Sequence, residues 1–286
     1  MLGAIVVLIG RALVWLIFAT IQDLKQREIA NWLNFSLLIF GLGFRFFYSL
    51  FLDNFGFFVQ GLIWLGIFFI FAILLYYLRF FAGGDFKLMF SLGVIIPISS
   101  SFLINLKVSF VFVILFFFVG FLYTIFSSFF LVFKNFEGFS RKFKAEFNNY
   151  YTIFLISSIL IFVLLLAVFF KYINFLFSIP LFIILLIPYL YIYLKTVESL
   201  FLVKSVRVGD IKEGDWLYKE VRLPSKVIKS NWEGLSKEDI KELKKYRKRV
   251  FIRYGIPFSP VFLVSFLILI LFLHFDFVSV LWNSFW

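Results

Sequence analysis

Residues 56–78 read GFFVQGLIWLGIFFIFAILLYYL, a run of 23 residues that contains no charged side chain. A helix needs about 20 predominantly apolar residues to cross the hydrocarbon core of a bilayer. Comparable runs recur along the chain, which is 63% hydrophobic and 24% aromatic and has a mean hydropathy of +1.02. The sequence therefore predicts an all-α polytopic membrane protein.

We predict a bundle of about eight transmembrane helices, and the charges between them predict its orientation. Every second connection is rich in Lys and Arg, whereas the alternate connections and both termini hold few. Basic loops stay in the cytoplasm. We therefore expect a cell-membrane protein with both termini outside. The predicted spans are residues 2–22, 32–52, 56–80, 86–104, 108–133, 150–170, 173–194 and 257–274.

The chain is expected to have three parts. Residues 1–195 form a transmembrane core, with the functional part within about 1–133. Residues 196–254 form a small α+β insert in the cytoplasm. Residues 255–286 form a C-terminal transmembrane helix and tail.

Local signals predict the structure of the insert. Gly-containing turns predict short strands at 206–210 and 213–217. Ser236, followed by Asp239, resembles a capping box that opens a helix. An apolar stripe on that helix would consist of Ile240, Leu243, Tyr246 and Val250. Its other face is basic, which indicates either a solvated face near anionic headgroups or a contact surface for a substrate or partner.

Composition limits the chemistry of the chain. The net charge is +12, which membrane topology and the anionic inner leaflet explain better than nucleic acid does. We therefore expect membrane lipids, and no nucleic acid, as partners. The chain has no Cys, and His274 is its one histidine. These counts argue against disulfides, zinc-thiolate sites, multi-histidine metal sites and a Ser-His-Asp triad, so no metal or cofactor is expected.

Two aspartates are the candidate catalytic residues. The first 133 residues contain four acidic side chains, which are Asp23, Glu28, Asp53 and Asp85. A carboxylate at the centre of a membrane helix costs about 2.5–3.5 kcal/mol, so acids close to spans are functional candidates. In the predicted topology Asp23 ends a span that enters the cytoplasm and Asp85 begins a span that leaves it. Both are expected at the cytoplasmic face, and Asp53 is expected at the opposite face.

A close pair of carboxylates suits amide hydrolysis. Both members cannot ionise easily, so the pair carries a single proton near neutral pH. The ionised member can take a proton from water while the protonated member polarises a carbonyl, as in aspartic proteases. Such chemistry needs no metal, thiol or histidine. Either aspartate could instead be only a helix cap or a charge at headgroup level.

Residues around Asp85 support this interpretation. Gly83 and Gly84 would allow close approach of a substrate backbone or a helix, and unusual dihedral angles where the helix begins. The helix dipole would favour ionised Asp85, which hints that Asp23 is the protonated partner. Lys87 would either anchor the chain at the interface or bind an acidic group of a substrate.

Other polar residues of the apolar runs have structural interpretations. Arg11 and Arg45 lie within these runs and are costly there unless they snorkel or pair. Asn31 is expected to cap the second span.

Two segments resemble type IV prepilin peptidases. Residues 23–33, DLKQREIANWL, resemble the element in which Asp is followed by Arg and Ile-Pro-Asn. Residues 82–89, AGGDFKLM, resemble the Gly-X-Gly-Asp motif and its trailing Lys-Leu. The order and separation also fit, over roughly residues 1–130. Ala82 replaces the first Gly and Ala30 replaces the Pro, and both leave the two acids in place.

The resemblance implies a specific function. The lack of a Cys-rich zinc domain is similar to the archaeal branch, which includes preflagellin peptidases. The insert and residues 253–258 are similar to the C-terminal extension of some archaeal members. The family implies a membrane aspartyl endopeptidase that removes leader peptides from type IV pilin-like (prepilin) or archaellin (preflagellin) precursors at the cytoplasmic face. Asp23 and Asp85 would be the catalytic pair. No methyl-donor site is recognised.

Three alternatives stay open at this stage. A protease like presenilin would carry Tyr-Asp and Pro-Ala-Leu motifs, but Gln22 precedes Asp23 and no Pro-Ala-Leu occurs. A proton-coupled transporter using the same carboxylates would place them near the middle of the bilayer, between paired broken spans. A scaffold in pilus assembly would have no activity. The oligomeric state is not predicted.

Overall fold

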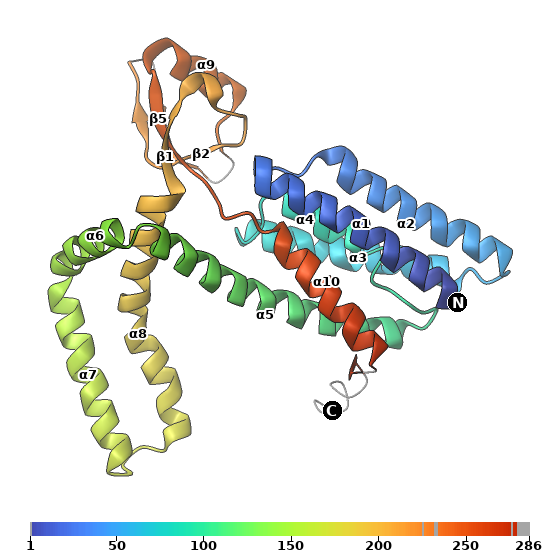
Figure 1. Cartoon of the computed structure of the whole chain (residues 1–286), viewed down its shortest axis with the longest axis horizontal. Coiled ribbons are helices and arrows are strands. Elements are labelled where there is room, and N and C mark those ends of the chain that lie inside the picture. The colour runs from blue at the N-terminus through green and yellow to red at the C-terminus, as the bar shows by residue number, and fades with distance from the viewer. Residues whose placement is uncertain (1, 225, 232–233, 276, 279–286) are drawn as a thin grey trace. The chain divides into compact units, whose positions relative to one another are not determined.

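The computed structural model describes residues 2–224, 226–231, 234–275 and 277–278 of the chain (Figure 1). It forms two compact units. The first contains residues 1–125 and 257–286, and the second contains residues 126–256. The predicted tail at residues 279–286 lies outside the described residues.

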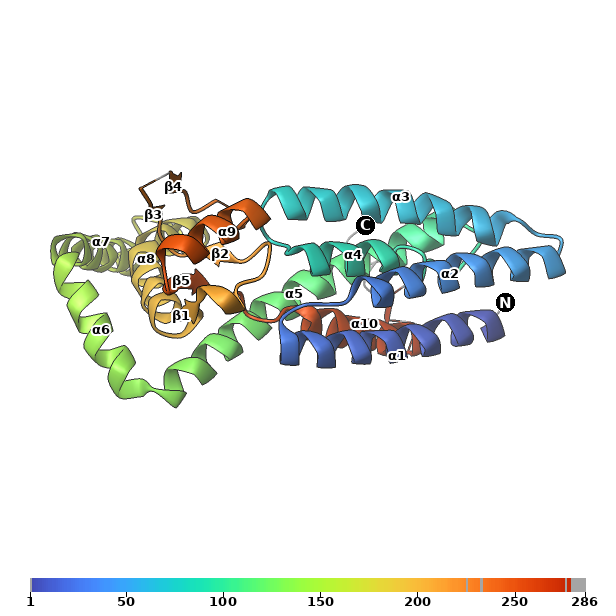
Figure 2. The same cartoon turned by 90° about the horizontal axis from the view of Figure 1, so that it is seen from above.

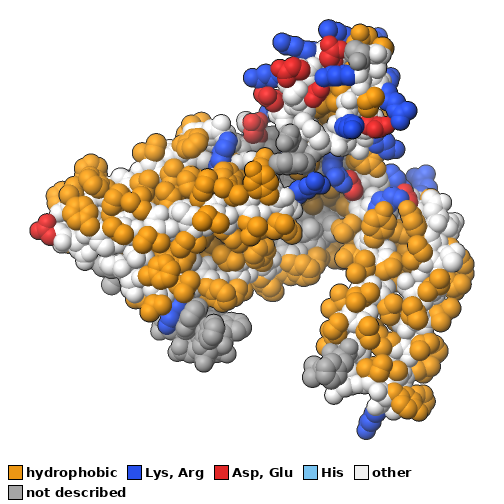
Figure 3. Space-filling model, turned by 180° about the vertical axis from the view of Figure 1, so that it is seen from behind, with side chains coloured by type: hydrophobic (Ala, Val, Ile, Leu, Met, Phe, Trp, Pro, Cys, Tyr) orange, Lys and Arg blue, Asp and Glu red, His pale blue; other side chains and the backbone are white. Residues whose placement is uncertain are grey.

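Long apolar helices dominate the described part of the chain, where six are long and apolar enough to cross a membrane. Hydrophobic side chains cover their outer faces (Figure 3), as expected of helices in lipid. The prediction of an all-α polytopic membrane protein with a small sheet-containing insert is therefore confirmed. The six helices are α1 (Leu2–Gln26), α2 (Asn31–Phe51), α3 (Gly56–Tyr77), α5 (Phe102–Lys134), α7 (Tyr151–Phe169) and α8 (Phe175–Val197).

The first unit is a helix bundle that the end of the chain completes. Two shorter helices, α4 (Gly83–Leu92) and α10 (Ser259–His274), join α1, α2, α3 and the start of α5. Helix α1 packs against α2 and α10, and α4 packs against α2 and α3 (Figure 2). Aromatic rings fill the core, where Phe116 contacts Phe81, Phe112 and Phe262.

The predicted continuous span at residues 86–104 is wrong. Helix α4 ends at Leu92, and residues 93–101 are not helical before α5 begins at Phe102. A helix of 10 residues rises only about 15 Å. The physical reason is the segment GVIIPISSS, because Pro97 cannot donate a helical hydrogen bond and the serines favour turns. The fourth apolar run is thus half helix and half irregular backbone.

Buried polar side chains satisfy this irregular backbone. Arg45 is fully buried and donates to the carbonyl of Val94 (2.6 Å), to that of Phe57 (3.0 Å) and to that of Pro97. Asn105, also fully buried, accepts from the amides of residues 98 and 99 (3.0 and 2.9 Å). Irregular backbone inside a bilayer is tolerated where protein groups pair it. Arg45 therefore pairs with backbone carbonyls, one of the two roles expected for it.

Two glycines make this packing possible. A Cβ on Gly61 would lie 2.6 Å from the Arg45 Cδ atom, and a Cβ on Gly93 would lie 2.6 Å from the Phe68 Cβ atom. Real Cβ atoms do not approach so closely. Gly61 thus leaves room for the arginine side chain, and Gly93 lets the end of α4 approach α3.

The membrane-spanning part of the second unit is a helical hairpin with an amphipathic helix beside it. Helices α7 and α8 pack together, and α6 (Phe136–Asn149) packs against α8. The ring of Phe147 stacks on that of Phe154 with centroids 4.3 Å apart. Lys195 forms an ion pair with Glu146 (2.8 Å), which ties α8 to α6.

The insert is a small α+β domain. Strand β5 (Arg249–Arg253) lies between β1 (Val203–Arg207) and β2 (Trp216–Leu217), and both pairings are antiparallel. A second sheet pairs β3 (Val221–Arg222) with β4 (Val227–Ile228). The sequence predicted short strands here, although β1 begins and ends earlier than expected.

Helix α9 (Lys237–Tyr246) packs on the insert's core. The predicted capping box is confirmed, because Ser236 Oγ accepts from the Asp239 amide (3.1 Å) and Asp239 Oδ2 accepts from the Ser236 amide (3.3 Å). The predicted apolar stripe is only partly right. Ile240 and Leu243 are buried, but Tyr246 is 47% exposed and Val250 lies in β5. The helix ends at Tyr246, before Val250, because the chain turns into the central strand.

Candidate active site

Asp23 lies in the last turn of α1 and is buried, with 7% of its surface exposed. The helix ends just beyond it, where Arg27 adopts a left-handed conformation (φ 55°) and its amide donates to the Asp23 carbonyl (2.7 Å). The Asp23 side chain accepts a hydrogen bond from the backbone N–H of Ser259, the first residue of α10 (3.0 Å).

Asp85 lies in the first turn of α4 and is also buried, with 8% of its surface exposed. The connection from α3 reverses at Arg79 (φ 66°), where the Phe80 amide donates to the Leu75 carbonyl (2.9 Å), as in a Schellman motif. The Asp85 Oδ2 atom accepts from the Ala82 amide (3.3 Å). Asp85 thus lies near the start of a helix, as the sequence predicted.

The structure brings Asp23 and Asp85 together. The C-terminal end of α1 and the N-terminal end of α4 lie at the same end of the first unit (Figure 2). The two carboxyl groups are close enough for their charges to interact. Asp53 is exposed in the turn between α2 and α3, at the other end of the unit, and does not join them.

The surroundings of Asp85 differ from the prediction in part. A Cβ on Gly84 would make an ordinary contact with Ile29 (3.5 Å), whereas a Cβ on Gly83 would meet no described atom within 4 Å. The predicted unusual dihedral angles are wrong, because both glycines are helical and neither has a positive φ.

Lys87 connects α4 to α2. Its Nζ atom donates to the side-chain oxygen of Asn31 (2.5 Å). The predicted capping role of Asn31 is wrong, because the N-cap of α2 is Ala30, which makes no side-chain cap bond. Nothing in the sequence indicated this contact between residues 56 positions apart.

Comparison with known proteins identifies the part of the chain that carries both aspartates. The sequence profile described as "Type IV leader peptidase family" matches residues 11–133. This part of the chain is thus similar to that family. We call residues 11–133 the leader peptidase region. Together with the six long apolar helices, the match makes this chain a multi-pass membrane protein.

A curated relative agrees with this assignment. The preflagellin peptidase of Methanococcus maripaludis (strain C6 / ATCC BAA-1332) is 29% identical over 127 residues, which make up 42% of this chain and 55% of that protein. The chain thus spans about half the length of the curated relative that it matches.

Sequence reasoning missed Ser259 as a neighbour of the leader peptidase region. It lies 236 residues after Asp23 and outside the matched residues. Its contact uses the backbone N–H, which every residue except proline carries, so no residue type could have revealed it. No group of three or more His, Cys, Asp or Glu that could hold a metal occurs among the residues that the structure describes.

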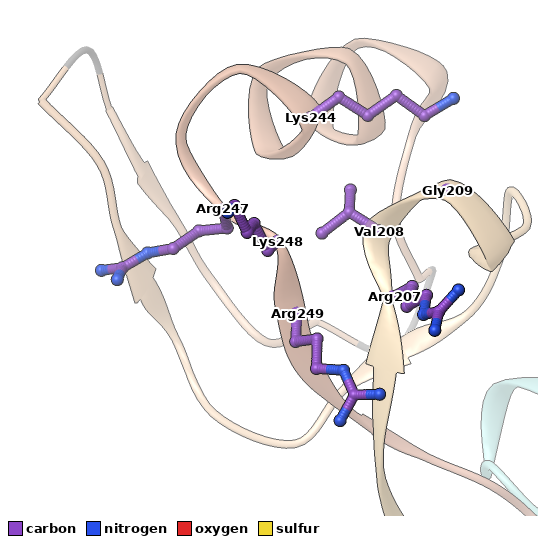
Figure 4. Close-up of a pocket in the computed structure, with 7 residues that line it drawn as sticks. All are labelled: Arg207, Val208, Gly209, Lys244, Arg247, Lys248 and Arg249. Carbon is purple, nitrogen blue, oxygen red and sulfur yellow. The ribbon is translucent and has the colours of Figure 1, made fainter.

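A pocket of about 510 Å³ lies in the insert (Figure 4). Arg207 and Arg249 face each other across β1 and β5. Val208 and Gly209 complete its lining together with Lys244, Arg247 and Lys248. The basic character expected of this part of the insert is present, and both interpretations of it remain predictions.

Proposed function

We propose that this protein is a membrane aspartic endopeptidase that removes leader peptides from type IV pilin-like or archaellin precursors. One observation carries the proposal. Within the leader peptidase region, Asp23 and Asp85 come from different helices, are both buried, and lie close enough for their charges to interact. Buried like charges are costly, so a role in chemistry explains the arrangement better than two independent helix caps do.

The pair would hydrolyse a peptide bond with one shared proton. The ionised carboxylate takes a proton from water, and the water oxygen attacks the scissile carbonyl carbon. The protonated carboxyl group gives its proton to the carbonyl oxygen, which forms a neutral tetrahedral diol. When the diol collapses, the leaving nitrogen takes a proton from the first carboxyl group and the C–N bond breaks. A proton from the diol returns to the second carboxylate, and the pair again carries one proton.

The start of α4 is open beside Gly83, where an added Cβ would meet no described atom within 4 Å. The open space beside Gly83 is where a substrate could approach without meeting a side chain. A precursor with a basic leader and a following hydrophobic helix would place its cleavage site at the membrane surface. The many Lys and Arg residues of alternate connections favour the cytoplasmic surface for this end of the bundle.

The proposal is tested by changing each acid alone. The chain with Asp23→Asn or Asp85→Asn is reconstituted in lipid vesicles, and shortening of a precursor peptide with an archaellin-type leader is followed by mass spectrometry. We expect each change to lower the cleavage rate by about 10²- to 10⁴-fold, whereas the matched control Asp53→Asn keeps the wild-type rate. Full cleavage by either single variant would remove that acid from the mechanism.

The structure offers little support for a proton-coupled transporter. In the described part of the chain, a span is broken at residues 93–101, and such breaks often bind ions in transporters. However, Asp85 lies at the opposite end of α4 from the break, and the side chains of Arg45 and Asn105 already pair with the irregular backbone. The broken span therefore supports the bundle, and its position does not favour transport.

A further inference from the structure

We infer that the N-terminus of α10 is a working part of the active site, with the backbone N–H of Ser259 as a positioning group for Asp23. The inference rests on the proposed function and extends it to a helix outside the leader peptidase region. The Ser259 nitrogen lies 3.0 Å from the Asp23 Oδ2 atom, and the bond is buried. It joins the last turn of the first helix to the first turn of α10.

The first residue of a helix is well suited to this task. Its N–H has no acceptor within the helix, so it is free to bind a carboxylate. The partial positive charge of the helix N-terminus adds a favourable interaction with a negative group. In α10 the next residue, Pro260, has no N–H, and the Val261 amide donates to the Phe258 carbonyl (3.0 Å). The Ser259 N–H is thus the donor of this turn that serves Asp23.

The start of α10 is held in place by α5. Tyr123 Oη donates to the Pro257 carbonyl (2.8 Å). The Phe258 ring packs edge-on against Phe116 and reaches Gly120, where an added Cβ would lie 3.0 Å from it. The donor therefore comes from a fixed backbone, which can orient the Asp23 carboxylate before substrate binds.

The hydroxyl group of Ser259 contributes no bond to this arrangement. Its Oγ atom is buried and has no hydrogen-bond partner among the described residues. The two aspartates also differ in the source of their backbone donor. Asp85 accepts from Ala82, next to its own helix, whereas Asp23 depends on a helix from the far end of the chain. The leader peptidase region thus contains both acids but lacks one of the groups that hold them.

The test compares two variants that have the same side chain at position 259 and differ only in the backbone N–H donor. Two full-length chains are compared. The first is Ser259→Ala, and the second carries lactic acid at position 259, which has the side chain of alanine but replaces the backbone N–H with an ester oxygen. A hydrogen bond to a charged group contributes enough for a loss of about 10- to 100-fold in cleavage rate. We expect that loss in the ester chain relative to Ser259→Ala.

A second measurement separates this inference from the proposed function. Dicyclohexylcarbodiimide labels protonated carboxyl groups, and peptide mass spectrometry locates the label. Loss of the donor disfavours the ionised form, so labelling of Asp23 in the ester chain should extend to higher pH than in Ser259→Ala. Asp85 is a titratable group that interacts electrostatically with Asp23, and its labelling is recorded in parallel. This measurement needs no cleavage, so it remains valid if the chain proves not to be a peptidase.

The outcomes are distinct. A shifted labelling curve for Asp23 supports the inference, and reduced cleavage by the ester chain supports its role in catalysis. Identical labelling curves in the two chains would overturn it, even if cleavage falls, because the fall would then reflect a general structural defect. Ser265→Ala serves as a control on the same helix, since Ser265 is also buried with an unpartnered Oγ atom among the described residues. It should change neither measurement.

Discussion

Replacing Arg45 with methionine should destabilise the first unit, because three backbone carbonyls would lose their donor. The methionine keeps an unbranched apolar stem beside Gly61 but cannot donate to the carbonyls of Val94, Phe57 and Pro97. Each buried acceptor left without a partner costs about 1–3 kcal/mol, which gives about 3–9 kcal/mol in total.

The buried charge offsets part of this cost. Arg45 is fully buried, and removing a guanidinium group from such a site relieves its desolvation penalty. Removing one partner of a buried charged interaction while the other stays typically costs about 3–5 kcal/mol. We therefore expect the Arg45→Met variant to lose stability by an amount in the lower half of the range given above. Such a loss is a large share of the free energy of unfolding of a typical domain.

The assay is reversible unfolding in mixed detergent micelles, combined with amide exchange of residues 93–101. Arg11→Met is the matched control, because Arg11 is exposed and only lies over the Phe40 ring (5.6 Å). Its loss should cost less than about 1 kcal/mol. Equal stability of the two variants, or unchanged exchange at residues 93–101 in Arg45→Met, would refute the reasoning.

Two further predictions concern the insert. Burial alone would raise the pKa of Asp239, but hydrogen bonds from the side chains of Lys226 and Ser236 outweigh it and hold the pKa below its usual range. The stability that ionised Asp239 contributes is therefore present above its unfolded pKa of about 3.9 and is lost as the pH falls through the lower folded pKa. Amide exchange of α9 should rise over this pH range. The Asp239→Asn variant should lack this pH dependence. Arg207 and Arg249 face each other in register, so changing both to Gln should weaken the binding of anionic lipid by about 30-fold at about 1 kcal/mol per charge. Thermal unfolding with added anionic lipid measures this, and an equal lipid-induced shift in the wild type and the double variant would contradict it.

The sequence predicted the parts of the fold that composition determines. Uncharged runs such as residues 56–78 located most of the membrane helices, and Ser236 with Asp239 located the start of α9. The irregular segment at residues 93–101 was not predicted, because its apolar composition matches that of a membrane span. Its backbone is satisfied by Arg45 and Asn105, and only the tertiary structure shows which carbonyls and amides they reach.

In the candidate site too, the sequence indicated the two acids but not the contacts that hold them. Asp23 and Asp85 were found because acids are rare beside apolar runs and their flanking residues resemble a known motif. The contact of Lys87 with Asn31 connects helices that no sequence period relates. The bond from Ser259 is made by the backbone, so its residue type holds no information about it.

The first unit is made from the two ends of the chain, residues 1–125 and 257–286, with the second unit between them. The entropy of bringing such ends together grows only with the logarithm of the intervening length, so doubling that length costs about 0.6 kcal/mol. Evolution can therefore exchange, enlarge or shorten the middle of the gene at little thermodynamic expense. The helix that reaches Asp23 must be retained through each such exchange, and we expect rearrangements of this gene to preserve α10 while the middle diverges.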